Sequence, residues 1–292
     1  MKRITNDNDI KKINDSLFFK AVVLHNFLTK VKILIMTEIK KYLNAAIEIA
    51  TLGGEHTLKY FKKDFDVISK EDDSPVTIAD RETEQLMRAE IEKRFPDHGI
   101  IGEEFGKTNE ESDIQWVLDP IDGTKSFIHG IPFYTTLVGV MIDNEPVVGI
   151  INCPALNEIC AAAIGHGVTF NGEPCKMKET QSLEDCTVLV TEINRFNRMG
   201  MQKQFQELLD KTKIHRTWGD AYGHMMVATG RADIMIDPIL SIWDAAALLP
   251  VMKEAGGVFS DFDGKETIHT GNGFSTNKHL YPLVKEIFEG QK

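Results

Sequence analysis

Apolar residues recur at helical spacing over residues 37–61, which predicts an amphipathic helix there. A second helix is predicted over residues 80–95, because this stretch opens with an acidic turn and stops before Pro96. The short apolar runs at residues 99–102 and 116–119 predict strands, and Pro120 is expected to end the second one. The chain thus begins its regular pattern with helices and continues into a sheet.

Residues 133–142 and 146–153 are rich in β-branched side chains and predict a β-hairpin with a tight turn at residues 143–145. The run 158–164 continues this sheet. From residue 187 the pattern alternates, with strands expected at 187–193, 213–218, 232–237 and 257–262 and helices around 201–209, 221–229 and 243–255. The predicted fold class is therefore α/β, with an α+β half over residues 37–185 followed by an α/β half over residues 186–292.

The first 36 residues form an extension that need not belong to this fold. Their apolar stretch, residues 17–36, is interrupted by Lys20, His25, Lys30 and Lys32, so it fits neither a membrane span nor a signal-peptide core. An amphipathic surface helix is one interpretation. The favoured one is a translation start at Met36, where a new helical pattern begins. Without a membrane segment, a cytoplasmic protein is expected.

Composition narrows the function classes. The 292 residues are 42% hydrophobic, enough for a large core, and carry a formal net charge of −11. Such an acidic chain is a poor general binder of nucleic acid or anionic membranes. The four cysteines form no C-x-x-C pair, so free thiols in a reducing compartment are expected. An acidic protein that handles an anionic substrate needs cations to mediate the contact, so the charge balance is compatible with the use of metal ions.

Four segments place carboxylates at strand ends or helix starts: PVTIAD ending at Asp80, GEEFG at 102–106, DPIDGT at 119–124 and WDAA at 243–246. Carboxylates gathered in one site repel each other unless a cation lies between them. Hard divalent cations such as Mg²⁺ prefer these oxygen ligands. The segments therefore predict a metal site or a strongly perturbed titration.

DPIDGT is the most informative of these segments. With the strand ending at Pro120, Asp119 and Asp122 can face one metal site. Gly123 permits close approach of a ligand, and Thr124 can begin a helix whose N–H groups point at an anion. Alone, each piece has an ordinary role, because Asp-Pro and Asp-Gly are common turns. Glu103 and Glu104 alone read as a solvated pair, and Asp244 alone reads as a first-turn helix acid. The functional argument rests on their joint, ordered occurrence.

GEEFG, WVLDPIDGTKSF and WDAAALLPVMKEAGG, in this order, resemble the signature motifs of the inositol monophosphatase family. The resemblance runs from about Glu38 to the C-terminus. It implies the layered α-β-α-β-α sandwich of the inositol monophosphatase and fructose bisphosphatase type, assembled as a homodimer. It also implies a phosphomonoesterase that uses two or three Mg²⁺ ions and an activated water, without a phosphoenzyme.

The resemblance also assigns roles to single residues. The implied metal ligands are Glu103, Asp119, Asp122, Asp244 and the backbone carbonyl of Ile121. The implied catalytic groups are Glu103 and Thr124, which orient the water, and Asp80, a nearby carboxylate that can serve a third metal. The implied phosphate and substrate contacts are Gly123, Thr124, Asp220, Asp237 and Lys70.

The strings G-D-A-Y-G at 219–223 and M-I-D-P at 235–238 resemble the histidinol-phosphate phosphatase branch. Inositol-type members usually carry a small residue in place of Asp220 and Glu in place of Asp237. An extra carboxylate at Asp220 would favour a cationic substrate such as histidinol phosphate of histidine biosynthesis. Asp220 could instead cap the helix that starts at Ala221.

The first interpretation is thus hydrolysis of L-histidinol phosphate. The alternatives are an inositol-1-monophosphatase or a broad sugar or nucleotide phosphatase. A different class, a non-catalytic regulatory protein on the same fold, remains open, although the complete set of metal ligands argues against it.

Overall fold

The computed structural model describes residues 7–63, 67–69 and 75–289, with side chains described for residues 32–63 and 77–289. Residues 1–41 and 42–292 form two separate units. Helix α1 (Asp7–Thr57) contributes to both, so the helix predicted over residues 37–61 begins earlier and ends sooner than expected. Within the described part of the chain, no helix has the length and apolarity needed to cross a membrane.

Removal of residues 1–35 is expected to leave the protein soluble, folded and fully active, because residues 42–292 form a compact unit of their own. The measurement compares the melting temperature and the specific activity of the full chain with those of a chain that begins at Met36. An insoluble or inactive shortened chain would show that the fold depends on the removed residues.

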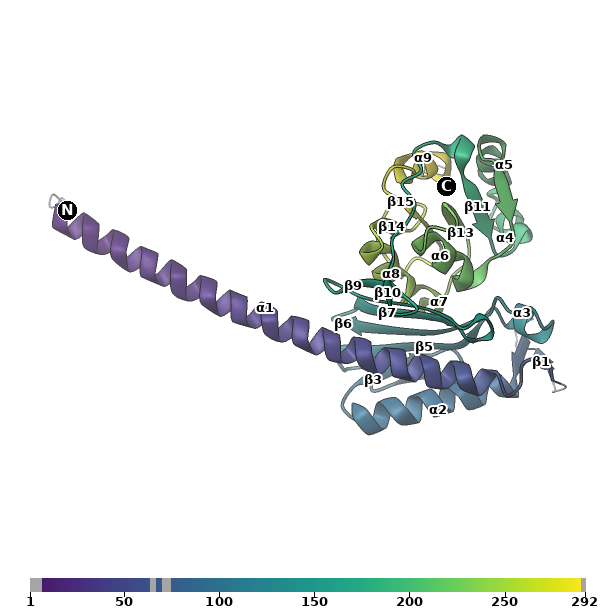
Figure 1. The fold of residues 1–292 in the computed structure, drawn as a ribbon, viewed down its shortest axis with the longest axis horizontal. Helices are drawn as coiled ribbons and strands as arrows, with labels where there is room; N and C mark the ends of the chain where they lie inside the picture. The colour runs from purple at the N-terminus through teal and green to yellow at the C-terminus, as the bar shows by residue number, and fades with distance from the viewer. Residues whose placement is uncertain (1–6, 64–66, 70–74, 290–292) are drawn as a thin grey trace. The chain divides into compact units, whose positions relative to one another are not determined.

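An eight-stranded sheet carries the first half of the larger unit, in the order β10-β9-β8-β7-β6-β5-β3-β4. Its strands are β3 (Gly99–Gly102), β4 (Gly106–Thr108), β5 (Ile114–Asp122), β6 (Thr135–Ile142), β7 (Glu145–Cys153), β8 (Glu158–Ala163), β9 (Gly167–Phe170) and β10 (Glu173–Pro174). Residues 42–57 of α1 and helix α2 (Ile78–Arg94) cover one face (Figure 1). The Asn152 amide of β7 donates to the Ala50 carbonyl of α1 at 2.8 Å and ties the two layers together.

The hairpin of β6 and β7 confirms the predicted turn, whose residues Asp143 and Asn144 both adopt positive φ. The prediction that Pro120 ends its strand is wrong. Strand β5 continues to Asp122, with a register shift between Asp119 and Asp122. Pro120 has no N–H to donate, and its carbonyl accepts from the Thr136 hydroxyl at 2.9 Å, so the irregular pairing accommodates it.

The second sheet has five strands among the described residues, in the order β12-β11-β13-β15-β14. They are β11 (Thr187–Val190), β12 (Ile214–Arg216), β13 (Ile234–Asp237), β14 (Gly257–Ser260) and β15 (Gly273–Asn277). The strand predicted over 187–193 ends early, because helix α4 (Ile193–Arg198) starts there. Strand β15 and helix α9 (Tyr281–Phe288) were not predicted.

Helices α6 (Asp220–Ala228), α7 (Ile242–Ala245) and α8 (Leu248–Glu254) lie between the two sheets (Figure 1). Their apolar residues join the inner faces of both sheets in one core, for example Leu137, Met225, Leu248 and Phe259. Helices α5 (Gln202–Lys211) and α9 cover the outer face of the second sheet. This arrangement is the predicted layered α/β architecture.

The remaining elements are short: β1 (Val67–Ser69) pairs with β2 (Pro75–Thr77), α3 (Thr124–Ile128) follows β5, and the 3₁₀ turns are Pro154–Leu156 and Leu183–Asp185. The first sheet is built from residues 99–174 and the second from residues 187–277. A division into halves near residue 185 stays a prediction.

The segment that carries Asp244 rests directly on two glycines of the first sheet. Gly139 and Gly149 are paired across β6 and β7. A Cβ at Gly149 would lie 2.0 Å from the Ala247 carbonyl oxygen, so only glycine permits this approach. The helix predicted over residues 243–255 is instead divided into α7 and α8, which are separated by Ala246 and Ala247.

Candidate active site

A cavity of about 1160 Å³ opens where the ends of β5, α3, α6, β13 and α7 meet. Most of the predicted site residues line it: Glu103, Asp119, Ile121, Asp122, Gly123, Thr124, Asp220, Asp237 and Asp244. Asp80 is not among its lining residues, although it lies in the adjoining helix. Lys70 falls outside the described residues. Predicted residues from segments more than a hundred positions apart in the sequence therefore line one cavity.

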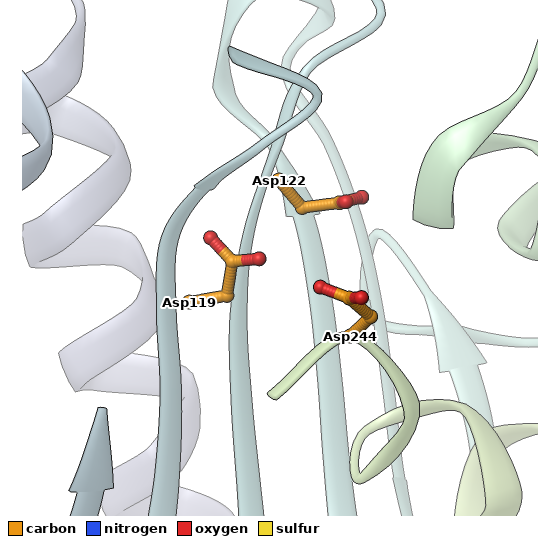
Figure 2. Close-up of side chains that lie close together, drawn as sticks. All are labelled: Asp119, Asp122 and Asp244. Atoms are coloured by element: carbon orange, nitrogen blue, oxygen red, sulfur yellow. The ribbon is translucent and has the colours of Figure 1, made fainter. Parts of the chain in front are cut away.

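Three carboxylates form the centre of this cavity. One oxygen from each of Asp119, Asp122 and Asp244 lies within 4.8 Å of the others. Figure 2 shows the two β5 side chains and the α7 side chain pointing toward one another. The donors are all oxygens, which is the set that a hard divalent cation prefers. The cluster therefore fits a metal ion of this class.

Two helix caps fix carboxylates at the metal site and beside it. Asp244 is the third residue of α7, and its Oδ2 accepts from the Ser241 backbone N–H at 2.6 Å. Asp80 holds the same position in α2, where its Oδ2 accepts from the Thr77 N–H at 2.8 Å. These are capping boxes, so the ordinary helix-cap role coexists with a functional one. The other Asp80 oxygen, Oδ1, is buried without a hydrogen-bond partner among the described residues.

The two β5 aspartates are held by their own loop and by α6. Asp119 is 2% exposed, and its Oδ1 accepts from the Ile121 N–H at 3.0 Å. Asp122 accepts from the Thr135 hydroxyl at 3.1 Å and from the Ala221 N–H at 2.6 Å. Asp122 thus caps the start of α6. This bond joins the metal-site loop to the helix that carries Asp220.

Burial and mutual repulsion raise the pKa of these carboxyl groups. Desolvation is the largest cause for Asp119, whose pKa lies well above its usual range, followed by the charges of Glu103, Asp122 and Asp244. Burial, followed by the Asp122 charge, raises the pKa of Asp244 to about 8, and burial with the charges of Glu104 and Glu103 raises that of Asp80 to about 7. A bound cation would offset this repulsion, so the charge pattern agrees with the donor chemistry.

A buried ion pair, which no sequence pattern indicated, holds the loop that carries Glu103. The Glu84 carboxylate of α2 accepts from the Glu104 N–H at 2.7 Å, from the Phe105 N–H at 3.2 Å and from Arg88 Nε at 2.7 Å. A Cβ at Gly102 would lie 2.0 Å from Glu84 Oε1, so glycine leaves room for the carboxylate. Glu84 therefore fixes the backbone beside Glu103.

Gly123 and Thr124 form the turn from β5 into α3. Gly123 has a φ of +84°, a conformation that glycine adopts without strain. The Thr124 hydroxyl donates to the Ile121 carbonyl at 3.1 Å, which leaves its oxygen lone pairs free to accept a hydrogen bond from a ligand. The first-turn N–H groups of a helix have no intrahelical acceptor, so this turn can bind an anion.

Asp220 stands at the start of α6 and adopts a φ of +53°, which Asp tolerates better than most residues. A Cβ on Gly123 would lie 2.9 Å from Asp220 Oδ2, so the carboxylate lies beside the turn at Gly123 and Thr124 that can bind an anion. Asp122, not Asp220, accepts the Ala221 N–H. Burial and then the Asp237 charge raise the pKa of Asp220 to about 7, and Arg195 opposes this.

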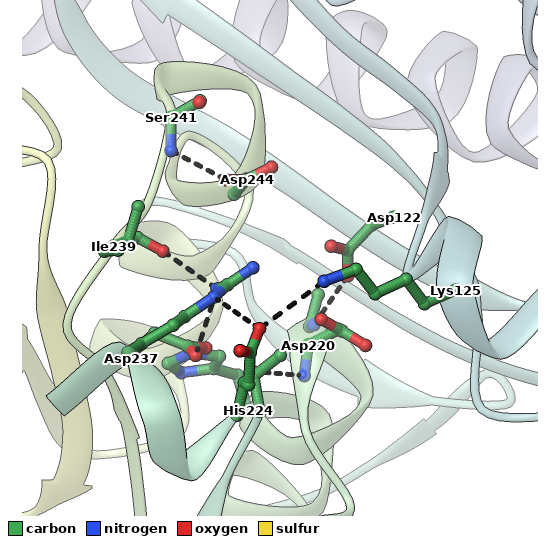
Figure 3. Close-up of polar contacts among 12 residues, drawn as sticks. Asp122, Lys125, Asp220, His224, Asp237, Ile239, Ser241 and Asp244 are labelled. Atoms are coloured by element: carbon green, nitrogen blue, oxygen red, sulfur yellow. Dashed lines mark hydrogen bonds and ion pairs between the residues drawn. The ribbon is translucent and has the colours of Figure 1, made fainter. Parts of the chain in front are cut away.

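Two cationic side chains line the cavity beside these acids and are themselves paired. Lys125 lies 3.4 Å from a Glu192 oxygen, and Arg195 Nε lies 3.8 Å from the same carboxylate. Arg195 also donates to the Ile239 carbonyl at 3.1 Å. Figure 3 shows these contacts around Asp220 and Asp237. Arg195 and the buried His224 were not predicted, because no motif marks them.

Comparison with known proteins agrees with the geometry. Residues 38–291 match the inositol monophosphatase family. A histidinol-phosphatase from Chlorobaculum parvum is 40% identical over 86% of this chain and 98% of its own. A fructose-1,6-bisphosphatase/inositol-1-monophosphatase from Thermotoga maritima is 37% identical over 69% of this chain and 75% of its own. An inositol monophosphatase structure from Zymomonas mobilis, 29% identical, superposes with a TM-score of 0.77 over 86% of this chain and 98% of that one.

Proposed function

Because this chain belongs to the inositol monophosphatase family and is a phosphoric monoester hydrolase, we propose that it hydrolyses L-histidinol phosphate to L-histidinol and phosphate with Mg²⁺. The observation that carries the proposal is the position of Asp220 and Asp237, two further carboxylates in the cavity of the Asp119, Asp122 and Asp244 cluster. The similarity to a histidinol-phosphatase over nearly its full length supports the same substrate.

The Mg²⁺ ligands in this proposal are Asp119, Asp122, Asp244, Glu103 and the Ile121 carbonyl, with Asp80 available for a third ion. Their all-oxygen chemistry and their raised pKa values support this assignment. When bound, Mg²⁺ supplies the positive charge that acidifies water and stabilises the phosphoryl oxygens and the leaving alkoxide.

The chain's own residues orient the reactants. The Thr124 hydroxyl donates a hydrogen bond to the Ile121 carbonyl, so its oxygen can accept a hydrogen bond from the attacking water and aim the water at phosphorus. Glu103 is the carboxylate placed to share that role. The backbone N–H groups of Gly123 and Thr124 bind the phosphate. No side-chain nucleophile is required, so no phosphoenzyme is expected.

The charge balance supports a monophosphate with a cationic tail. Lys125 and Arg195 both form ion pairs with Glu192, so neither is available to bind a second phosphate group without losing that pair. Asp220, Asp237 and Glu192 place three carboxyl groups beside these two cations, and a cationic ligand would favour the ionised form of Asp220, whose pKa is raised to about 7. An ammonium or imidazolium group suits such a surface better than the neutral hydroxyls of inositol.

The second candidate is an inositol or sugar monophosphatase, which the similarity to the Thermotoga enzyme favours.

The proposal also includes a homodimer in the cytoplasm, which the family resemblance supports. Analytical ultracentrifugation tests the dimer. The four cysteines are free, as expected for that compartment.

A substrate panel tests the proposal. Phosphate release is measured with Mg²⁺ on histidinol phosphate, inositol monophosphate, fructose 1,6-bisphosphate and adenosine 3′,5′-bisphosphate. Histidinol phosphate is expected to give the highest kcat/KM. A higher value for inositol monophosphate would replace the proposed substrate. Zero turnover on the whole panel would favour a non-catalytic regulatory protein.

Glu84→Gln is expected to raise the Mg²⁺ concentration for half-maximal activity by roughly 10-fold, because the loop beside Glu103 loses its charged anchor. Isothermal titration calorimetry with Mg²⁺ checks the same shift without substrate. Glu92→Gln, an exposed change on the same helix, is the control and should leave Mg²⁺ binding unchanged. Equal Mg²⁺ affinities for all three proteins would show that the Glu84 bonds do not affect the site.

A further inference from the structure

His224 is fully buried, yet it lines the cavity, and the proposed reaction gives it no role. It lies four residues after Asp220 in α6, and both residues line the cavity. Its imidazole meets the edge of the Phe259 ring with 5.9 Å between the ring centroids. A polar ring held this firmly at a substrate cavity needs a partner for each nitrogen.

Both ring nitrogens have such partners. Nδ1 lies 2.6 Å from the Ser275 hydroxyl of β15, and Nε2 lies 3.3 Å from Asp237 Oδ2 at the end of β13. A carboxylate only accepts, so Nε2 must carry the proton that faces Asp237. In the neutral ring Nδ1 then accepts from Ser275. The Asp237 carboxylate thus sets the tautomer, and the Ser275 hydroxyl supports it by donating to Nδ1.

This donation leaves the two Asp237 oxygens unequal. Oδ2 is engaged by His224, whereas Oδ1 is buried and has no hydrogen-bond partner within the described residues. Arg195 Nη1 forms an ion pair with Oδ1 at 3.8 Å, which is beyond hydrogen-bond distance. A buried carboxylate oxygen without a donor, on a residue that lines the cavity, is placed to accept from a ligand.

We propose that His224 is a positioning residue for substrate selection: it holds Asp237 by Oδ2 and presents Oδ1 to a donor on the leaving group. The inference rests on the proposed function, in which Asp237 contacts the substrate. Without the His224 bond, we expect the Asp237 carboxylate to turn toward Arg195 and shorten their 3.8 Å ion pair to hydrogen-bond distance, which removes the free acceptor from the cavity. His224 therefore acts through Asp237 and contacts no reacting atom.

Two substitutions of His224 separate this role from simple packing. In His224→Gln the terminal amide reaches the place of Nε2 and can still donate to Asp237. In His224→Asn the shorter amide reaches only the place of Nδ1, so it can bond Ser275 but not Asp237. We expect KM for histidinol phosphate to rise roughly 10-fold in the Asn variant and less than about 3-fold in the Gln variant, with kcat similar in both.

The experiment measures KM and kcat for both variants and the wild type, on histidinol phosphate and on glycerol phosphate, together with melting curves. KM for glycerol phosphate should change less than about 2-fold in either variant, since its leaving group offers no cationic donor. Ser275→Ala, which removes the partner of Nδ1 but leaves the bond from Nε2 to Asp237, should give a smaller KM increase on histidinol phosphate than His224→Asn.

The outcomes distinguish the inference from the proposed function. A wild type that does not prefer histidinol phosphate over glycerol phosphate overturns the proposed function. A wild type with that preference, but with equal KM for the Gln and Asn variants, overturns the role of His224. If both variants lose activity on both substrates in proportion to lower melting temperatures, His224 only packs the core, and the inference is wrong.

Discussion

Asp119→Asn is expected to lower kcat by at least about 100-fold while the protein stays folded. Asp119 lies in the triad of carboxylates whose oxygens approach within 4.8 Å, and it is the most buried member. The amide keeps the size of the side chain and still offers an oxygen to the Ile121 N–H. It removes the negative charge that a divalent cation requires, so the effect falls on the chemical step.

Kinetics at saturating substrate over a range of Mg²⁺ concentrations measure this loss. Asp143→Asn is a suitable control, because Asp143 is exposed in the β6–β7 turn and Asn tolerates its positive φ. It should retain wild-type activity. Activity of the unmodified enzyme should also vanish in EDTA and return with Mg²⁺. Full activity in EDTA would falsify the metal mechanism, whatever the variants show.

The acidic residues could be predicted because each sits beside a local signal. Asp119 directly precedes Pro120, and Asp122 directly precedes Gly123. Asp80 and Asp244 occupy the third position of helices whose N-caps are Thr77 and Ser241. Capping and strand-end geometry are encoded within a few residues, so the sequence alone indicates where these carboxylates point. The hairpin at residues 143–144 was predictable for the same reason.

The residues that were missed depend on contacts between distant segments. His224 obtains its role from Asp237 and from Ser275, which lies 51 residues further along the chain. In the sequence Glu84 is one of several acids on a polar helix. Its role depends on the packing of α2 beside residues 104–105, whose N–H groups donate to it. Pro120 within β5 was mispredicted, because the register shift that accommodates it depends on pairing with β6. Such effects arise only when the layers assemble.

Asp220 is the residue on which substrate choice depends, and the structure changes how it should be tested. The helix-cap alternative is weakened, because the Gly223 N–H, which a cap at Asp220 would bind, donates to the Gly219 carbonyl at 3.2 Å. Asp220 also adopts a φ of +53°, where alanine is strained. Asp220→Ala therefore mixes a backbone cost of roughly 1 kcal/mol with the loss of charge. Asp220→Asn keeps the backbone preference and the size, and removes only the charge.

Asp220→Asn is expected to lower kcat/KM on histidinol phosphate by roughly 10- to 150-fold, the range for losing one charge-assisted hydrogen bond of about 1.5–3 kcal/mol. Glycerol phosphate should be affected much less, because its leaving group carries no cation. Asp263→Asn, an exposed change in the same half of the chain, controls for net charge. Equal losses on both substrates would mean that Asp220, whose carboxylate lies beside Gly123, supports the phosphate and metal chemistry that both substrates share. That result would remove the main physical reason to prefer histidinol phosphate over inositol phosphate.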